Sequence, residues 1–174
     1  DQLRLESSGL LSQLNGDETF SIAAKEISLT GGPTASGDLG SGPGSGLGQF
    51  HMQAEMLDFA GGKTGLAGFD SVVIDTGLTT WSADTEILVS SDLNLHAGQI
   101  IPSAATDLSL LISGDLDIQQ GSVLKGTTIS PELGGRLRML ADSVRLSADL
   151  ALPSGELNIE STQGSIDLGG ANLN

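Results

Sequence analysis

Apolar and polar residues alternate in short runs along most of the chain. Segment 85–95 has the same pattern as segment 108–118, because Ile87 and Val89 return 23 positions later as Leu110 and Ile112. Alternation with a period of two residues predicts β-strands that bury one face. A pattern that returns after a fixed interval of this size is typical of a solenoid. The sequence therefore predicts stacked turns of chain with apolar columns such as Val89/Ile112, Leu93/Leu116 and Leu95/Ile118.

Each of these units consists of two alternating runs joined by a polar corner, which is Ser90-Ser91-Asp92 in one unit and Ser113-Gly114-Asp115 in the next. A leucine-rich repeat would show a different leucine spacing and a helical return. Parallel strands of one sheet are nearly always joined by right-handed crossovers, and neighbouring strands lie about 4.8 Å apart. We therefore predict an all-β fold, a right-handed parallel β-helix (β-solenoid), of roughly seven turns.

A second repeat has a longer offset. Residues 20–32 and 50–62 share a pattern at an interval of 30 residues. The additional length is the Gly-, Ser- and Pro-rich segment 33–48, for which we expect a loop inserted at a corner, either a tolerated flexible excursion or part of a binding face. Residues 1–19 alternate loosely. There we expect an N-terminal edge or decoration of the solenoid, with a short helix at 9–14 as one option, and the β-helix over 20–174.

A later unit resembles these two in its spacing. Ala141-x-x-Val144-x-Leu146 matches Ala24-x-x-Ile27-x-Leu29, with Asp142-Ser143 and Lys25-Glu26 as corners. The match predicts equivalent positions in their turns.

The composition limits the residue types that can form the core and the classes of partner that the chain can bind. Aromatic residues make up 3% of the chain, with no Tyr and one Trp, so the core is predicted to be mainly aliphatic. The net charge of −15 argues against nucleic acid, which needs a basic patch. An acidic surface keeps a repeat protein soluble and protects the strand edges from lateral pairing, although it can also be functional. The chain has no Cys, which fits export as an unfolded chain.

No stretch approaches the roughly 20 apolar residues of a membrane helix, and the start has no signal-peptide pattern. Because the chain begins and ends within the repeat pattern, we expect a piece of a longer repeat protein.

Three residues are candidate ligand contacts. Trp81 could be a stacking platform for a sugar, although a lone Trp in a strand more often flanks the core. Arg138 and Arg145, with Arg136, are predicted to cluster in one unit, where they could bind a ligand or offset neighbouring acids. His51 and His96 have no metal-ligand spacing, so we expect isolated, outward-facing histidines.

A polysaccharide lyase or hydrolase is the alternative that this fold raises, because both need clustered or paired carboxylates. Asp58, Asn94, Asp117 and Asp167 each lie between two apolar residues, which predicts an outward ladder along one sheet. Such a ladder could bind Ca²⁺ or remain solvated. Few basic residues are available to complete such a site, so we expect no catalysis, no cofactor and no bound metal.

Several segments resemble the degenerate repeats of filamentous haemagglutinin-like exoproteins of two-partner secretion. They are Asp-Leu-Asn-Leu-His-Ala-Gly at 92–98, Gly-Asp-Leu-Asp-Ile at 114–118, Asp-Ser-Val-Arg-Leu-Ser-Ala at 142–148 and Gly-Ser-Ile-Asp-Leu-Gly-Gly at 164–170. The resemblance covers about residues 20–170. The family's N-terminal secretion domain with its Asn-Pro-Asn motif and a following toxin domain are absent, and the repeats have no catalytic or receptor-binding residues to transfer.

The resemblance implies a structural and adhesive shaft segment of a secreted bacterial surface protein, either an adhesin or a contact-dependent toxin-delivery stick. The implied partners are a receptor or glycan on a host or neighbouring cell and an outer-membrane transporter of the two-partner type. We expect a monomer. The alternative is a carbohydrate-binding or polysaccharide-degrading β-helix protein.

Overall fold

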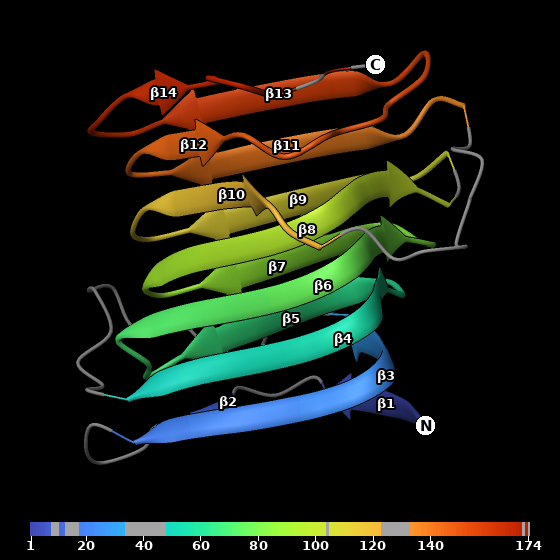
Figure 1. Cartoon of the computed structure of the whole chain (residues 1–174), viewed down its shortest axis with the longest axis vertical. Helices are drawn as coiled ribbons and strands as arrows, with labels where there is room; N and C mark the ends of the chain where they lie inside the picture. The colour runs from blue at the N-terminus through green and yellow to red at the C-terminus, as the bar shows by residue number, and fades with distance from the viewer. Residues whose placement is uncertain are drawn as a thin grey trace.

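The computed structural model describes residues 1–7, 11–12, 18–33, 48–103, 105–122, 133–171 and 173. Within them the chain winds into a β-solenoid of about six turns, without a helix, so the predicted fold is confirmed. The two termini lie at opposite ends of the stack (Figure 1). No helix in the described part of the chain is long and apolar enough to cross a membrane.

The strands of successive turns pair in parallel, and within the described residues they form two sheets. The eight-stranded sheet contains β1 (Gln2–Ser7), β3 (Thr19–Gly31), β4 (Gln49–Phe59), β6 (Ser71–Trp81), β8 (Asp92–Pro102), β10 (Leu116–Gln120), β12 (Val144–Leu146) and β14 (Ile166–Asp167). The six-stranded sheet contains β2 (Leu11–Ser12), β5 (Gly62–Ala67), β7 (Thr85–Val89), β9 (Asp107–Ile112), β11 (Arg136–Ala141) and β13 (Glu156–Ser161).

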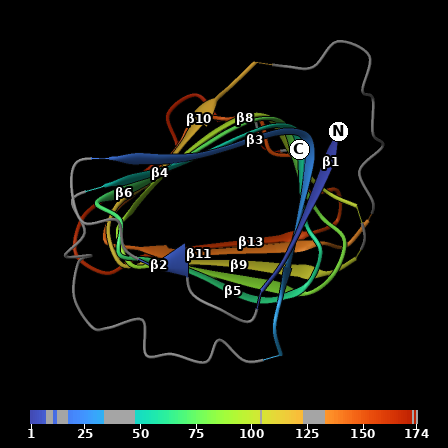
Figure 2. The same cartoon turned by 90° about the horizontal axis from the view of Figure 1, so that it is seen from below.

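Viewed along the stack, the solenoid has three sides (Figure 2). The first side contains the beginnings of β3, β4, β6 and β8, together with β10, β12 and β14. These four long strands then bend to form the second side, where β1 pairs with β3, and the six-stranded sheet is the third side. At the bend the alternation shifts by one residue, since Ala54 and Leu57 in β4 are both buried and Glu55 between them is exposed. The corner expected at Lys25-Glu26 lies at this bend of β3.

The predicted registers are confirmed. Leu93 pairs with Leu116 and Val89 with Ile112, at an offset of 23 residues, and Phe20 pairs with Phe50 at an offset of 30. The buried inward side chains of these strands form one continuous apolar core. Apart from a few aromatic and methionine side chains the core is aliphatic, as the composition predicts.

The predicted equivalence of the Ala141–Leu146 and Ala24–Leu29 units is wrong. Val144 pairs with Leu116 on the first side, whereas Ile27 pairs with Leu57 on the second side. The two motifs therefore lie at different corners. Ala54 to Leu57 and Ala141 to Val144 both shift the alternation by one residue although they lie at different corners. The spacing therefore shows that the chain turns but not which corner it turns at.

Two pairings among the described residues skip a turn. On the third side β2 pairs directly with β5 through Leu11 and Leu66. On the second side Ile100 forms a parallel bridge to Leu150, with the Ala151 N–H donating to the Ile100 carbonyl at 3.1 Å. Each of these pairings joins residues that lie two turns apart. About six turns form instead of the roughly seven predicted.

Part of the N-terminal prediction falls outside the described residues. Of the short helix considered at 9–14, the structure describes Leu11–Ser12, and these form strand β2. Residues 34–47, most of the predicted inserted loop, are also outside the described part.

Candidate functional site

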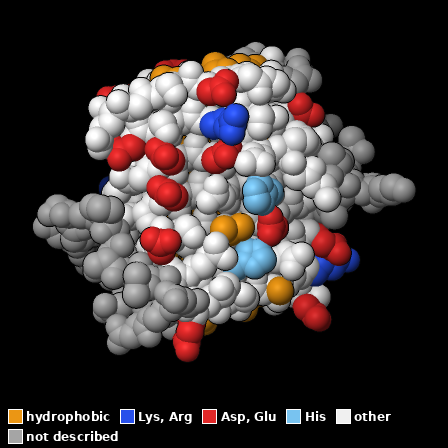
Figure 3. All heavy atoms as spheres, turned by 60° about the vertical axis from the view of Figure 1, so that its left-hand side comes forward, with side chains coloured by type: hydrophobic (Ala, Val, Ile, Leu, Met, Phe, Trp, Pro, Cys, Tyr) orange, Lys and Arg blue, Asp and Glu red, His pale blue; other side chains and the backbone are white. Residues whose placement is uncertain are grey.

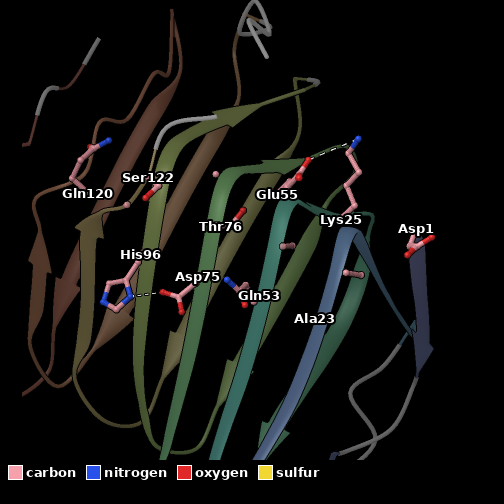
Figure 4. A pocket seen from close by; sticks show the side chains of 14 residues that line it. Asp1, Ala23, Lys25, Gln53, Glu55, Asp75, Thr76, His96, Gln120 and Ser122 are labelled. Atoms are coloured by element: carbon pink, nitrogen blue, oxygen red, sulfur yellow. Dashed lines mark hydrogen bonds and ion pairs between the residues drawn. The ribbon is translucent and has the colours of Figure 1, made fainter. Parts of the chain in front are cut away.

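One hollow in the described surface is an open groove along the bend between the first and second sides. Its volume is about 1030 Å³. Because the groove crosses β3, β4, β6 and β8 and reaches the end of β10, its walls come from successive turns (Figure 4). Small residues such as Ala23, Thr76 and Gly77 lie in it, while Lys25, Gln53, Glu55, Asp75, His96, Gln120 and Ser122 supply its polar groups.

A carboxylate between two histidines lies at this groove. Asp75 on β6 is 2.6 Å from His51 Nε2 on β4 through its Oδ2, and 2.6 Å from His96 Nδ1 on β8 through its Oδ1. Figure 3 shows the two histidines with an acidic side chain between them. All three side chains are about one-third exposed. The cluster therefore links three successive turns on the outer face of the first side.

The protonation of the cluster follows from Asp75. Partial burial raises the pKa of Asp75, but the hydrogen bonds and charges of His51 and His96 lower it, and the net pKa lies below its usual value. At neutral pH the carboxylate is therefore ionised and can only accept hydrogen bonds. Each histidine must then donate from the nitrogen that faces Asp75. A neutral His96 consequently has an unprotonated Nε2, which is an acceptor or a base.

The polar network continues on both sides of the cluster. Gln53 and His96 flank Asp75 in register, and at the bend Lys25 pairs with Glu55 at 3.9 Å. Chemically, the groove offers hydrogen-bond donors and acceptors held by their neighbours. Among the described residues, no group of three or more His, Cys, Asp or Glu has an arrangement that could hold a metal ion.

The structure places Trp81 in the core. Its side chain is fully buried, and its indole Nε1 donates to the Thr106 carbonyl oxygen at 3.0 Å. The ring is not exposed for stacking against a sugar. Trp81 therefore changes from a candidate ligand contact to a core residue, in agreement with the alternative interpretation of a lone strand Trp.

The three arginines do not form one cluster. Arg138 lies on β11 of the third side and is 3.8 Å from Glu160, whereas Arg145 lies on β12 of the first side and is 3.6 Å from Asp167. The corner at Asp142-Ser143 separates the two strands and directs them to different sheets. Arg136 and Arg138 share a shallow hollow of about 210 Å³ on the third side.

The predicted carboxylate ladder is only partly correct. Asn94, Asp117 and Asp167 lie in one outward row of the first side, but Arg145 separates the two acids. Asp58 lies on the second side, opposite Thr80. It is half-buried, and burial raises its pKa while hydrogen bonds from Ser82 partly lower it.

Other carboxylates bind to the next turn at the corners. Asp92 Oδ1 accepts a hydrogen bond from the Asp115 N–H at 2.9 Å, and Asp84 Oδ1 accepts from the Asp107 N–H at 3.0 Å. Asp115 accepts in turn from the Ser143 hydroxyl. A corner Asp therefore satisfies a backbone or hydroxyl donor of the turn above it.

The prediction of isolated histidines is wrong. His51 and Asp75 are 24 residues apart, and Asp75 and His96 are 21 residues apart. Both intervals are close to one turn of the solenoid, so the period itself brings the three side chains together. A search for polar residues at that interval would have found the cluster.

Comparison with family models, curated proteins and solved structures finds no match for this chain.

Proposed function

We propose that this chain is a shaft segment of a large secreted bacterial surface protein, an adhesin or a contact-dependent toxin-delivery stick. In this proposal the chain extends a distal binding or toxin region away from the cell. The partners would be an outer-membrane transporter of the two-partner type for export and a receptor or glycan on a host or neighbouring cell. The fold is equally compatible with β-helix enzymes, so the proposal depends on how the turns are joined.

The observation that carries the proposal is the continuous register between turns. From β4 to β8 each strand pairs over its whole length with the next, for example from Gln49 with Ser71 to Phe59 with Trp81. Such a stack transmits force along its axis through parallel backbone ladders and an unbroken apolar core. At about 4.8 Å per turn, six turns span roughly 29 Å, and further turns would extend the rod without changing its section.

Side chains strengthen the same axial connections. The corner acids Asp84 and Asp92 each accept a backbone N–H of the next turn, and Asp75 joins three turns through its two histidines. Hydrogen bonds to an ionised acceptor are stronger than neutral ones. These contacts resist the separation of turns, which is the deformation that tension along a shaft produces.

Single-molecule pulling between the two termini tests the proposal. A shaft is expected to keep its folded length under load and to lose turns from the ends, with each lost turn releasing about 23 residues or roughly 80 Å of extended chain. Extension at negligible force, without such steps, would contradict it. A parallel assay for new reducing ends on a panel of polysaccharides addresses the enzyme alternative, since sustained turnover would replace the shaft proposal.

A further inference from the structure

We propose that the groove at the bend between the first and second sides binds an uncharged oligosaccharide. This proposal adds a ligand to the shaft and does not depend on the chain being a shaft. It is carried by three observations: which polar groups in the groove are already engaged, how its charges are balanced, and how it lies across the strands.

The groove walls are held in place by hydrogen bonds within the protein. Gln120 donates from Nε2 to the Gly98 carbonyl at 2.8 Å and accepts the Asp149 N–H on Oε1 at 2.9 Å. Thr76 donates to the Leu78 carbonyl at 2.8 Å, and both Asp75 oxygens face histidine nitrogens. Because these groups are engaged, a ligand would meet a preformed wall and would not have to order it.

Two groups in the same region have unused hydrogen-bonding capacity. Gln53 is exposed and makes no hydrogen bond within the described residues, so its amide offers donors and an acceptor. His96 Nε2 is an acceptor when Nδ1 donates to Asp75. Figure 4 shows Gln53 and His96 on either side of Asp75. A sugar hydroxyl both donates and accepts, so neighbouring hydroxyls match this combination.

The charges favour an uncharged ligand. Lys25 is paired with Glu55 at 3.9 Å, and the Asp75 carboxylate is flanked by two imidazoles. Asp1 adds a carboxylate at one end of the groove. The chain as a whole has a net charge of −15, which repels sulfated and uronic acid polymers. The charged side chains in the middle of the groove, Lys25, Glu55 and Asp75, therefore already have partners within the protein.

The shape favours a chain-like ligand. The groove crosses from β3 to the end of β10, which is four strand spacings or about 19 Å. It lies on the face of the sheet, where the backbone groups are already paired, so an extended peptide could not add a strand there. An oligosaccharide needs only side-chain hydrogen bonds and is therefore the occupant that fits this surface.

Titration calorimetry of the whole chain with neutral oligosaccharides, and with sulfated and uronic acid oligosaccharides of equal length, tests the proposal. Binding of a neutral oligosaccharide is expected, and Gln53→Ala should weaken it about tenfold because it removes the amide contacts. Ala23→Trp places a bulky ring in the groove and should weaken binding at least as much. Arg138→Ala on the third side is the matched control and should leave binding unchanged.

Gln53 and Ala23 are exposed, so both variants are expected to keep the circular dichroism and melting temperature of the parent chain. Loss of binding with a retained fold then assigns the ligand to the groove. Absence of neutral-sugar binding, unchanged binding in both groove variants, or preference for the acidic oligosaccharides would each overturn the proposal. Zn²⁺ binding that His96→Ala abolishes, without sugar binding, would assign the cluster to a metal and overturn it as well.

Discussion

The long strands and the short strands of the eight-stranded sheet cover the apolar core in different ways. β4, β6 and β8 have 11 residues each and form two sides of the solenoid, whereas β10, β12 and β14 have five, three and two residues and form one. In the short-strand region the second side is reduced to bridges at Leu150. Nevertheless Ile118, Leu146 and Leu150 are fully buried.

The comparison shows which sides of the solenoid need paired strands to keep the core buried. In the short-strand region the register persists over a few residues on the first side and over whole strands on the third side, as between β11 and β13. The second side then only has to supply apolar side chains to the core. Within the short-strand region burial becomes incomplete at the last turn, where Ile166 is 46% exposed.

A charge in the first short strand should have the largest effect. Leu116 is buried and paired with Leu93 and Val144, so Leu116→Asp is expected to lower the free energy of unfolding by about 4 kcal/mol or more. The matched control is Leu111→Asp, since Leu111 faces outward and is half-buried, with an expected cost of about 1 kcal/mol. Urea unfolding followed by circular dichroism measures both, and equal effects would mean that the inward and outward positions are misassigned.

Removal of a large side chain should distinguish the long-strand region from the last turn. The Phe50 ring is fully buried, with ring centroids 5.9 Å from Phe20 and 5.3 Å from Phe69, so Phe50→Ala is expected to cost about 3–5 kcal/mol. Ile166→Ala, at the half-exposed end of the stack, should cost less than about 1 kcal/mol. The same urea titrations compare the two, and a larger loss at Ile166 would refute the gradient of burial.

Of two glycines with positive φ angles, the one inside the stack should be more sensitive to substitution by alanine than the one at its end. Gly62, with φ +79°, lies against the Gly31 carbonyl oxygen, which an added Cβ would overlap. Gly62→Ala is therefore expected to cost about 2–3 kcal/mol from strain and collision. Gly170 has φ +93° but no neighbour within 4 Å, so Gly170→Ala should cost about 1 kcal/mol. Melting temperatures of the two variants suffice, and equal shifts would show that backbone strain alone decides the cost.

The histidine cluster of the long-strand region should give a pH-dependent contribution. Because the folded pKa of Asp75 is lowered, its stabilisation is present above the unfolded pKa of about 4 and is lost as the pH falls through the folded value. Asp75→Asn should cost about 1 kcal/mol at pH 7, a modest value because solvent screens this partly exposed site. The melting temperatures of parent and variant should converge as the pH falls below about 4.

Asp58 is a control, because its effect on stability should change with pH in the opposite direction to that of Asp75. Burial raises its folded pKa, so its ionisation costs stability as the pH rises above the unfolded value of about 4. Relative to the parent, Asp58→Asn should therefore be more favourable at pH 7 than at pH 3. The same trend in both variants would show that the pH dependence does not come from these sites.

The smallest effect is expected at the ion pair between two short strands. Arg145 and Asp167 are 3.6 Å apart, and their side chains are 63% and 55% exposed. Arg145→Gln should change the free energy of unfolding by less than about 0.5 kcal/mol, with little dependence on salt. A loss above 1 kcal/mol in the urea titration would mean that this pair holds the last turn in place.

Sequence periodicity was sufficient for much of the fold. Strand register between Leu93 and Leu116 follows from the 23-residue interval, because an error of one residue would turn every apolar side chain outward. The aliphatic core and the polar corners follow from the same alternation. The spacing of His51, Asp75 and His96, which is close to one turn, also predicts that their side chains meet at the groove. Each residue considered separately does not indicate a cluster.

Only the tertiary structure decided which two sides each corner joins and which residues pair across two turns. Ala141-x-x-Val144 and Ala24-x-x-Ile27 have the same spacing but lie at different corners, because local alternation reports a turn and contains no information about the side that follows. The pairs Leu11/Leu66 and Ile100/Leu150 join residues two turns apart. Their separations in the sequence do not follow the 23-residue period, so no fixed interval predicts them. The sequence determined the period and the inward positions, and three-dimensional packing determined which turns meet.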